Sequence, residues 1–350
     1  MKKQLLTAAI LCCLVIAGST AAPKSAKKKP KIPVSRVQTH MDGYLGDRID
    51  ACIRVRVCSE DPDLLVAPMR RQTETSLWQS EFWGKWTLGA IASYRYNKDP
   101  ELLRKIEGGV ESLLAAQQPD GYIGNYAPEA QLTNWDVWGR KYTMLGLLAY
   151  YDLTGDKKAL DGAVRLADHL LTQIPAVRQI ERTGIYRGMS SCSILEPIML
   201  LYNRTLDEKY LDFARYIVDR MESADGPQLI AKALDGVPVS ERFPLDDPSR
   251  GWFVWENGQK AYEMMSCYDG LLELYKVTND PRYLKAVEAT VTSIIADEIN
   301  IAGSGSSFEC FYKGKALQTE PAYHTMETCV TMTWMKLCYD LLRLTRNPLY

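Results

Sequence analysis

Apolar and polar positions alternate along much of the chain with the period of an α-helix. In a recurring pattern, an aspartate is followed four residues later by a leucine, and apolar residues then stand at +3, +7 and +10 from that leucine. The leucines are Leu103, Leu160, Leu211 and Leu284. This spacing places the apolar residues on one stripe of a helix whose opposite face meets water. Each repeat therefore predicts one amphipathic helix.

The aspartate of each repeat ends a short turn, which we call a seam. Seams occur at residues 94–99, 151–156, 202–207 and 275–280, and a less regular fifth copy runs through 345–347. A short side-chain oxygen at this place accepts hydrogen bonds from the unpaired amides of the next helix. Each seam therefore predicts a joint between two helices.

The helix before each seam is apolar around more of its circumference, as in residues 144–151 and 268–275. Such helices must be covered on several sides, so the alternation predicts an inner ring of helices inside an outer ring. We predict an all-α fold, an (α/α)6 toroid over residues 40–350. With five seams for about six units, we expect the toroid to be incomplete in this chain. Strand signals are confined to residues 34–37, 237–239 and 308–312.

Composition supports an ordinary globular protein. The chain has 350 residues, of which 46% are hydrophobic, and a formal net charge of −1. This balance gives no support for a nucleic-acid partner, and we expect no stable membrane span. The start of the chain differs, with lysines at 2 and 3, an apolar stretch at 5–17 and small residues at 19–22. We predict a signal peptide at 1–22, a basic linker at 23–39 and export to the periplasm or the medium.

Two aromatic loops before predicted inner helices carry candidate sugar-binding residues. Flat rings beside polar side chains suit a sugar, whose C–H faces stack while its hydroxyls form hydrogen bonds. The same residues could instead pack the rim of the core. Because both loops enter inner helices, they suggest one shared cavity. The candidates are Asp120, Tyr122, Trp135, Trp138, Arg140, Lys141, Trp255 and Lys260.

A third segment, from 303 to 312 and on to 329, carries further candidates. Glu327 and Cys329 offer a carboxylate and a thiolate two residues apart. Such a pair could bind zinc if other ligands converge on it, although the motif by itself is a weak signal.

Several of these motifs together resemble glycoside hydrolase family 127, the β-L-arabinofuranosidase family that was formerly a domain of unknown function. They are Gln-Gln-Pro-Asp-Gly-Tyr at 117–122, the Tyr-x-x-Thr-Gly-Asp seam, Gly-Ser-Ser-Phe-Glu at 305–309 and Glu-Thr-Cys at 327–329. The resemblance covers roughly residues 40–350. It implies an (α/α)6 barrel and a retaining exo-glycosidase in which a zinc-bound cysteine thiolate attacks the anomeric carbon. By this resemblance Glu309 is the general acid and base, and Glu327 and Cys329 are zinc ligands.

The sequence departs from the family pattern in two places. The family takes its nucleophile from an adjacent cysteine pair well beyond Glu-Thr-Cys, whereas here only Cys338 follows. We therefore expect the C-terminal part of the catalytic domain, with the nucleophile, to be missing. Histidines that hold the sugar in the family are replaced by nearby cations, Arg140, Lys141 and Lys260. These favour an acidic, pectin-type sugar of plant cell-wall side chains, although they could also be rim cations in water.

Two other functions remain open at this point. An unsaturated-uronide hydrolase or a uronate lyase would use the same toroid and an aromatic, cationic cleft without zinc. An inactive fragment would keep the sugar-binding toroid and lack the nucleophile. In each case the partner is an oligosaccharide or glycoside, and the sequence does not indicate the oligomeric state.

Overall fold

Helices pair across the first four predicted seams in the computed structural model, which describes residues 39–243, 259–316 and 325–350. All four seam aspartates cap the following helix by accepting a backbone amide hydrogen two residues on. The distances are 2.9 Å at Asp99, 2.9 Å at Asp156, 3.1 Å at Asp207 and 3.0 Å at Asp280. In the fifth seam Asn347 takes the aspartate's place and accepts from the Leu349 amide at 3.1 Å. The predicted joints are therefore confirmed.

The described helices follow one another with short connections at the seams. The α-helices are α1 (Gly43–Cys52), α2 (Pro62–Arg71), α3 (Glu81–Asn97), α4 (Pro100–Ala115), α5 (Asp136–Thr154), α6 (Lys157–Gln173), α7 (Met189–Cys192), α8 (Leu195–Thr205), α9 (Glu208–Met221), α10 (Leu229–Leu234), α11 (Ala261–Thr278), α12 (Pro281–Asp297) and α13 (Thr328–Thr345). A π-helical turn covers Ile53–Val57, and 3₁₀ turns cover Pro128–Ala130, Ile180–Arg182 and Val239–Glu241.

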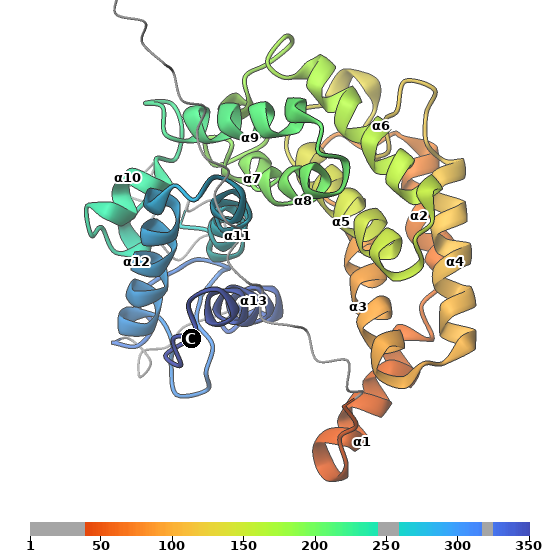
Figure 1. Cartoon of the computed structure of the whole chain (residues 1–350), viewed down its shortest axis with the longest axis horizontal. Coiled ribbons are helices and arrows are strands. Elements are labelled where there is room, and N and C mark those ends of the chain that lie inside the picture. Colours follow the sequence, from red (N-terminus) through yellow and green to blue (C-terminus); the bar gives the residue numbers. More distant parts are fainter. Residues whose placement is uncertain (1–38, 244–258, 317–324) are drawn as a thin grey trace, which may run out of the picture. The chain divides into compact units, whose positions relative to one another are not determined.

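The long helices form two concentric layers (Figure 1). Helix α3 packs on α5, α5 on α8, α8 on α11 and α11 on α13, which makes the inner layer. Helices α4, α6, α9 and α12 each pack against the inner helix that precedes them across a seam, and they make the outer layer. The order of the layers confirms the predicted α/α toroid arrangement.

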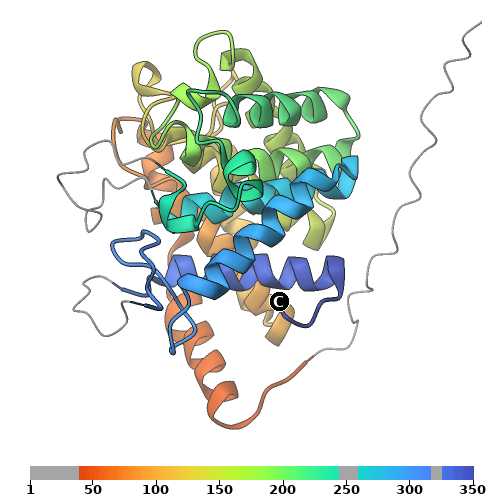
Figure 2. The ribbon, with the colours of Figure 1, turned by 90° about the vertical axis from the view of Figure 1, so that its left-hand side faces the viewer.

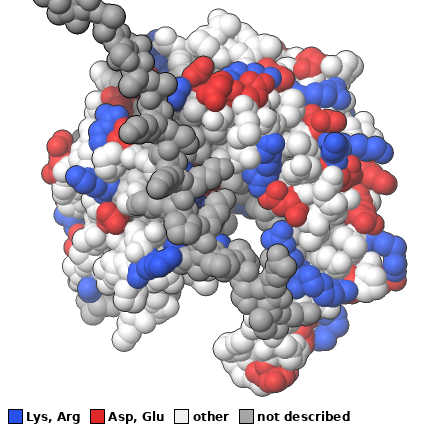
Figure 3. Space-filling view, viewed as in Figure 1, with Lys and Arg blue, Asp and Glu red and all other residues white. Residues whose placement is uncertain are grey.

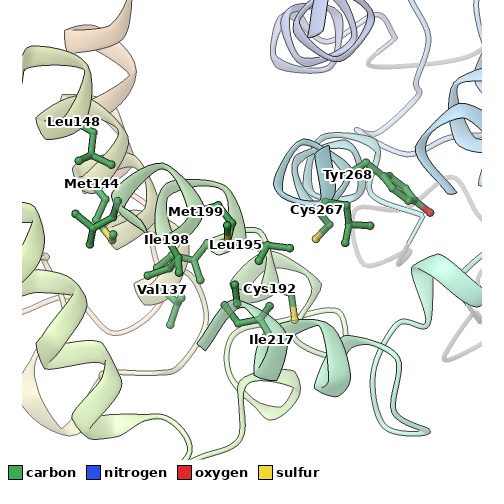
Figure 4. Packing of buried hydrophobic residues seen from close by; sticks show 14 of the residues in the cluster. Val137, Met144, Leu148, Cys192, Leu195, Ile198, Met199, Ile217, Cys267 and Tyr268 are labelled. Atoms are coloured by element: carbon green, nitrogen blue, oxygen red, sulfur yellow. The ribbon is translucent and has the colours of Figure 1, made fainter. Parts of the chain in front are cut away.

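Burial differs between the layers as the sequence pattern predicts. Helices α5 and α11 are buried around almost their whole circumference, whereas α6 and α9 bury one stripe. Figure 4 shows the inner layer from close by, where Met144 of α5, Ile198 of α8 and Cys267 of α11 are among the buried side chains. This core fixes the starts of the inner helices, from which the candidate residues project.

Strands are absent from the part of the chain that the structure describes. Residues 308–312 form only isolated bridges, in which Cys310 pairs with Lys260 and with Ser307. Residues 237–239 lead into a 3₁₀ turn instead of a strand. The third strand signal at 34–37, the predicted signal peptide and nearly all of the basic linker lie outside the described residues. Among the described helices, none combines the length and hydropathy that a membrane span requires.

Candidate functional site

Three loop segments meet where α11 and α13 begin. The Ala261 amide donates to the Glu309 carbonyl at 2.8 Å, and the Phe311 amide donates to the Gln259 carbonyl at 3.0 Å. The Met326 amide donates to the Ser306 carbonyl at 3.1 Å. Figure 2 shows the loop after α12 beside the first turn of α13, at the end of that helix away from the chain terminus marked C. These bonds place Lys260, Glu309 and the Glu-Thr-Cys segment in one region.

Glu309 is held in an unusual backbone conformation. Its φ is 64°, and that of Phe308 is 48°, in the left-handed region that costs a residue with a side chain on the order of 1 kcal/mol. Its carboxylate accepts a hydrogen bond from the Lys260 ammonium, and the side chain remains 33% exposed. A backbone strained in this way persists only where the surrounding structure fixes it, and the Glu309 side chain is then fixed in direction as well. Glu309 is therefore both positioned and accessible.

Lys260 is the buried cation of this region. Burial disfavours its charged form, but Glu263, Tyr186 and Glu309 outweigh that effect and raise its pKa. The ammonium also lies 5.7 Å from the centre of the Tyr186 ring. Lys260 therefore stays charged at neutral pH and is shared between two carboxyl groups.

Glu263 is the second of these carboxyl groups, and the sequence analysis missed it. It lies one turn after Lys260 in α11, is only 3% exposed, and its Oε2 has no hydrogen-bond partner among the described residues. Burial raises its pKa to about 7, with Lys260 acting in the opposite direction. At neutral pH this carboxyl group is thus divided between its protonated and ionised forms.

Glu327 and Cys329 lie together at the start of α13, as predicted. Burial raises the pKa of the Glu327 carboxyl, and its Oε2 is buried with no hydrogen-bond partner among the described residues. Burial also raises the pKa of the Cys329 thiol to about 12, so at neutral pH the thiol keeps its proton unless a strong cation lies against it. A carboxylate with an orphaned oxygen beside a thiol fits a zinc ion as two of its ligands. Within the described ranges, no group of three or more histidine, cysteine, aspartate or glutamate side chains is placed to hold a metal.

Helix α3 contributes two charged residues that sequence reasoning also missed. The Lys85 ammonium lies 3.8 Å from the Cys329 sulfur and 2.8 Å from the Glu81 carboxylate. The other oxygen of Glu81 accepts a hydrogen bond from the Trp138 indole. A lysine and a glutamate one turn apart on a helix look like an ordinary surface pair, so only the fold reveals that they face the thiol.

An aromatic cluster fills the space between α3, α5 and α11. The rings of Trp138 and Tyr262 meet edge to face at 5.0 Å, and the Tyr142 and Tyr262 hydroxyls are hydrogen-bonded. The ammonium groups of Lys85 and Lys141 lie over these rings, with Lys141 4.3 Å from the centre of Trp138. Both the predicted Trp138 and the predicted Lys141 are almost wholly buried. They are therefore packed inside this region and are not exposed at its rim.

Trp135 connects the cluster to solvent. Its ring lies 5.8 Å from Trp138, 6.4 Å from Tyr186 and 6.1 Å from Trp78, which is 44% exposed. Since Tyr186 also lies beside Lys260, this set of rings leads from the surface to the Glu309 carboxylate. The arrangement suits the stacking of a sugar ring, and the role of Trp135 in substrate binding stays a prediction.

Asp120, Tyr122 and Arg140 are placed elsewhere. Arg140 forms a fully buried ion pair with Asp136 at 2.6 Å, and the Tyr122 hydroxyl donates to the same carboxylate at 2.8 Å. Asp120 pairs with His169 of the outer helix α6. The structure therefore groups these three residues around Asp136 and not around Glu309, and their role in substrate binding stays a prediction. Trp255 lies outside the described residues.

Comparison with known proteins gives a consistent result. A family model described as the catalytic domain of β-L-arabinofuranosidases, glycoside hydrolase family 127, matches residues 36–350. The non-reducing end β-L-arabinofuranosidase of Bifidobacterium longum is 26% identical over 162 residues, which cover 43% of this chain and 24% of that protein.

Solved structures share the fold. A family 127 β-L-arabinofuranosidase from Geobacillus stearothermophilus T6 matches with a TM-score of 0.62 and 19% identity, over 87% of this chain and 53% of that one. A second family 127 β-arabinofuranosidase matches with a TM-score of 0.62 and 19% identity, over 88% of this chain and 50% of that one. The chain thus spans about half the length of these structures, and its match to the bifidobacterial protein spans about a quarter of that protein.

Proposed function

The chain belongs to glycoside hydrolase family 127, and on this premise we propose that it is a retaining exo-glycosidase for a terminal acidic sugar of plant cell-wall glycosides. The proposal rests on one observation, the convergence of the accessible Glu309 carboxylate, its Lys260 partner and the Glu327 and Cys329 side chains. The proposal includes export, which the apolar segment at residues 5–17 supports.

In this proposal Glu309 exchanges the protons of the reaction. As a carboxylic acid it donates to the leaving glycosidic oxygen while a cysteine thiolate forms a bond to the anomeric carbon. As a carboxylate it then takes a proton from the water that displaces this thiolate and releases the sugar. The side chain is suited to this because it is accessible while its backbone is fixed.

Zinc bound by Glu327 and Cys329 would supply the positive charge that ionises a thiol at neutral pH. These two residues project from the start of α13, so their spacing is set by the helix. Lys85 beside the Cys329 sulfur adds a second positive charge and favours the ionised form of that thiol.

The acidic-sugar part of the proposal follows from Lys260. A carboxylate on the sugar would compete with Glu309 for the ammonium, which leaves Glu309 free to hold the proton that the leaving oxygen needs. A neutral sugar offers no such competitor. The rings of Trp135 and Tyr186 beside Lys260 would stack against the sugar face.

The experiment compares two chromogenic β-furanosides that differ only in carrying a carboxylate or a neutral group. We expect higher kcat/KM for the carboxylated substrate, and we expect Lys260→Gln to lower the ratio of the two kcat/KM values at least about tenfold because one charge-assisted contact is lost. Glu309→Gln should lower kcat for both substrates by about 10²-fold to 10⁴-fold, the usual contribution of a general acid.

Lys209→Gln, a partly exposed lysine of the outer helix α9, is the control and should change neither value. A preference of the unaltered protein for the neutral furanoside would remove the acidic-sugar assignment. Unchanged hydrolysis in Glu309→Gln would remove the glycosidase mechanism itself.

A further inference from the structure

A polar cavity lies between the loop after α4 and the end of α6, next to Arg140 of α5, whose guanidinium contacts the lining residues His169 and Gln173. Its volume is about 510 Å³, and Asp120, Gln131, His169 and Gln173 are among its lining residues. Trp138 and Tyr142 of α5 face the aromatic cluster, whereas Asp136 and Arg140 point nearly half a helical turn away. Because no lining residue contacts Glu309, Lys260 or Cys329 among the described residues, this cavity is separate from the proposed catalytic centre.

The Asp120 carboxylate is held in place and remains accessible. One of its oxygens accepts a hydrogen bond from the Tyr122 amide at 3.0 Å, and the other lies 3.3 Å from His169 Nε2. The side chain is still 61% exposed. A carboxylate fixed in this way can accept hydrogen bonds from a ligand without first being ordered, which lowers the entropic cost of binding.

The charges behind Asp120 cancel one another. Burial, together with the nearby Arg140 guanidinium, lowers the pKa of His169, so its ring is neutral at neutral pH. The guanidinium lies 3.3 Å from His169 Nδ1 and pairs with the buried Asp136 carboxylate. Among its lining residues the cavity therefore offers a ligand one negative charge and no cation, while the exposed Arg165 donates to the backbone carbonyls of Gln118 and Pro119 in its wall.

Amide side chains make up much of the remaining wall. Gln72, Gln118, Gln131 and Gln173 all line the cavity, and Pro119 and Pro128 add apolar ring faces. Gln173 donates to Gln131 at 2.7 Å and accepts from Arg140 at 2.7 Å, which fixes both of its ends. Gln72 Nε2, in contrast, is buried and has no hydrogen-bond partner among the described residues.

Gln72 ends α2 in the left-handed backbone conformation, with a φ of 50°, as several other helices of this chain end. Its buried side-chain nitrogen has no hydrogen-bond partner among the described residues and is therefore a donor in the cavity wall that a ligand can use.

We propose that this cavity binds a neutral saccharide at a site separate from the catalytic centre. Amides both donate and accept hydrogen bonds, as sugar hydroxyls do, and the proline rings suit the C–H faces of a sugar. An anionic sugar would meet the Asp120 carboxylate with no cation among the lining residues to offset it, since the Arg165 guanidinium donates to the backbone carbonyls of Gln118 and Pro119. The two sites thus differ in charge, with Lys260 at the catalytic centre and Asp120 in this cavity.

The test is isothermal titration calorimetry of the whole protein with arabinotriose, a neutral probe, and with trigalacturonate, a charged one. We expect arabinotriose to bind and Asp120→Ala to weaken its binding at least about tenfold, the cost of one charge-assisted hydrogen bond. Gln72→Leu should weaken it severalfold. In the described structure the Gln72 side-chain nitrogen has no hydrogen bond that Gln72→Leu could break. A loss of arabinotriose affinity in this variant would therefore reflect the loss of a contact with the ligand and not a loss of folding.

The control is Asp161→Ala, an exposed aspartate on the same helix as His169, which should leave binding unchanged. Lys260→Gln should also leave arabinotriose binding at this cavity unchanged. The proposal is overturned if neither Asp120→Ala nor Gln72→Leu alters arabinotriose binding. It is also overturned if trigalacturonate or the cation spermidine binds more tightly than arabinotriose in an Asp120-dependent way.

Discussion

At the scale of single residues, the site is governed by one lysine between two carboxyl groups. Lys260 forms an ion pair with Glu309 and lies one helical turn before Glu263. A change in the charge of either carboxyl group therefore changes the electrostatic interaction of the Lys260 ammonium with the other one. The two carboxyl groups differ in access, since Glu309 is one-third exposed and Glu263 is buried. Glu309 can therefore contact a substrate, while the protonation state of the buried Glu263 changes the electrostatic environment of Glu309.

The burial of Glu263 has a measurable effect on stability. Its pKa is about 7 in the folded chain against an ordinary value of 4.5, so the folded state holds the proton more tightly. The contribution of the protonated Glu263 to the free energy of unfolding is fully present below about pH 4.5 and is lost as the pH rises to about 7. Glu263→Gln should remove this loss, on the order of 1–3 kcal/mol between pH 5 and pH 8. Urea unfolding at both pH values measures it.

Glu129→Gln, at an exposed glutamate, is the control and should follow the unaltered protein at both pH values. If the Glu263→Gln variant lost as much stability between pH 5 and pH 8 as the unaltered protein, the buried carboxyl group would not be the cause.

The candidate residues that the sequence singles out and those that it misses differ in a physical way. Glu309, Glu327 and Cys329 stand in segments whose residue types already suggest chemistry, and their segments do converge. Glu81 and Glu263 lie within helical patterns, where a charged residue is ordinarily solvated. Their roles depend on partners that only the packed fold brings close, such as the Trp138 indole for Glu81.

At the scale of elements, the seams explain why the fold could be predicted well. Each seam combines an aspartate, or asparagine in the fifth, with a preceding residue in the left-handed conformation, at Lys98, Gly155, Leu206, Asn279 and Arg346. The caps follow from residue types and could be predicted. The left-handed residues could not, because glycine, the usual residue there, occupies one of the five places.

Leu206 carries the least suitable of these side chains. Its φ is 56° and its side chain is 69% exposed, so the leucine gains little packing in return for backbone strain. Leu206→Gly should raise the free energy of unfolding by about 0.5–1 kcal/mol, since glycine adopts this conformation freely. Chemical denaturation at constant pH measures the change.

Leu64→Gly provides the matched control, because Leu64 is 68% exposed but lies inside α2. It should lower the free energy of unfolding by about 1 kcal/mol, which is the difference in helix propensity between leucine and glycine. Equal effects of the two substitutions would contradict the proposed strain at the seam.

At the scale of the whole molecule, the inner helices are joined by the ion pairs of two buried carboxylates with a partly exposed lysine, as well as by apolar packing. Lys336 of α13 bridges Glu196 of α8 at 2.8 Å and Asp269 of α11 at 2.7 Å. Burial raises the pKa of Asp269 to about 7, and burial lowers that of the neighbouring Lys141 to about 8. Cationic and anionic side chains are also interspersed over the face seen in Figure 3. Any electrostatic selection between substrates therefore depends on particular charged side chains, because positive and negative side chains are mixed over this face.

The layered arrangement also explains which parts of the site could not be located from sequence. Periodicity predicts which face of a helix is buried, but not which neighbour it meets. For this reason Asp120 and Trp138, expected in one shared cavity, lie on two sides of α5. The separation divides the predicted sugar-binding residues between the two sites that we propose, which differ in charge.

The central claim, that the convergent carboxyl and thiol groups form a zinc-assisted glycosidase centre, is tested most directly by the metal content of the purified protein. Elemental analysis after equilibration with zinc and removal of excess metal should find about one zinc per chain, and Cys329→Ser should lose it. Cys338→Ser, at a half-buried cysteine on the same helix, is the matched control and should retain it. The account is contradicted if the unaltered protein binds no zinc, or if Cys329→Ser changes neither the metal content nor the stability.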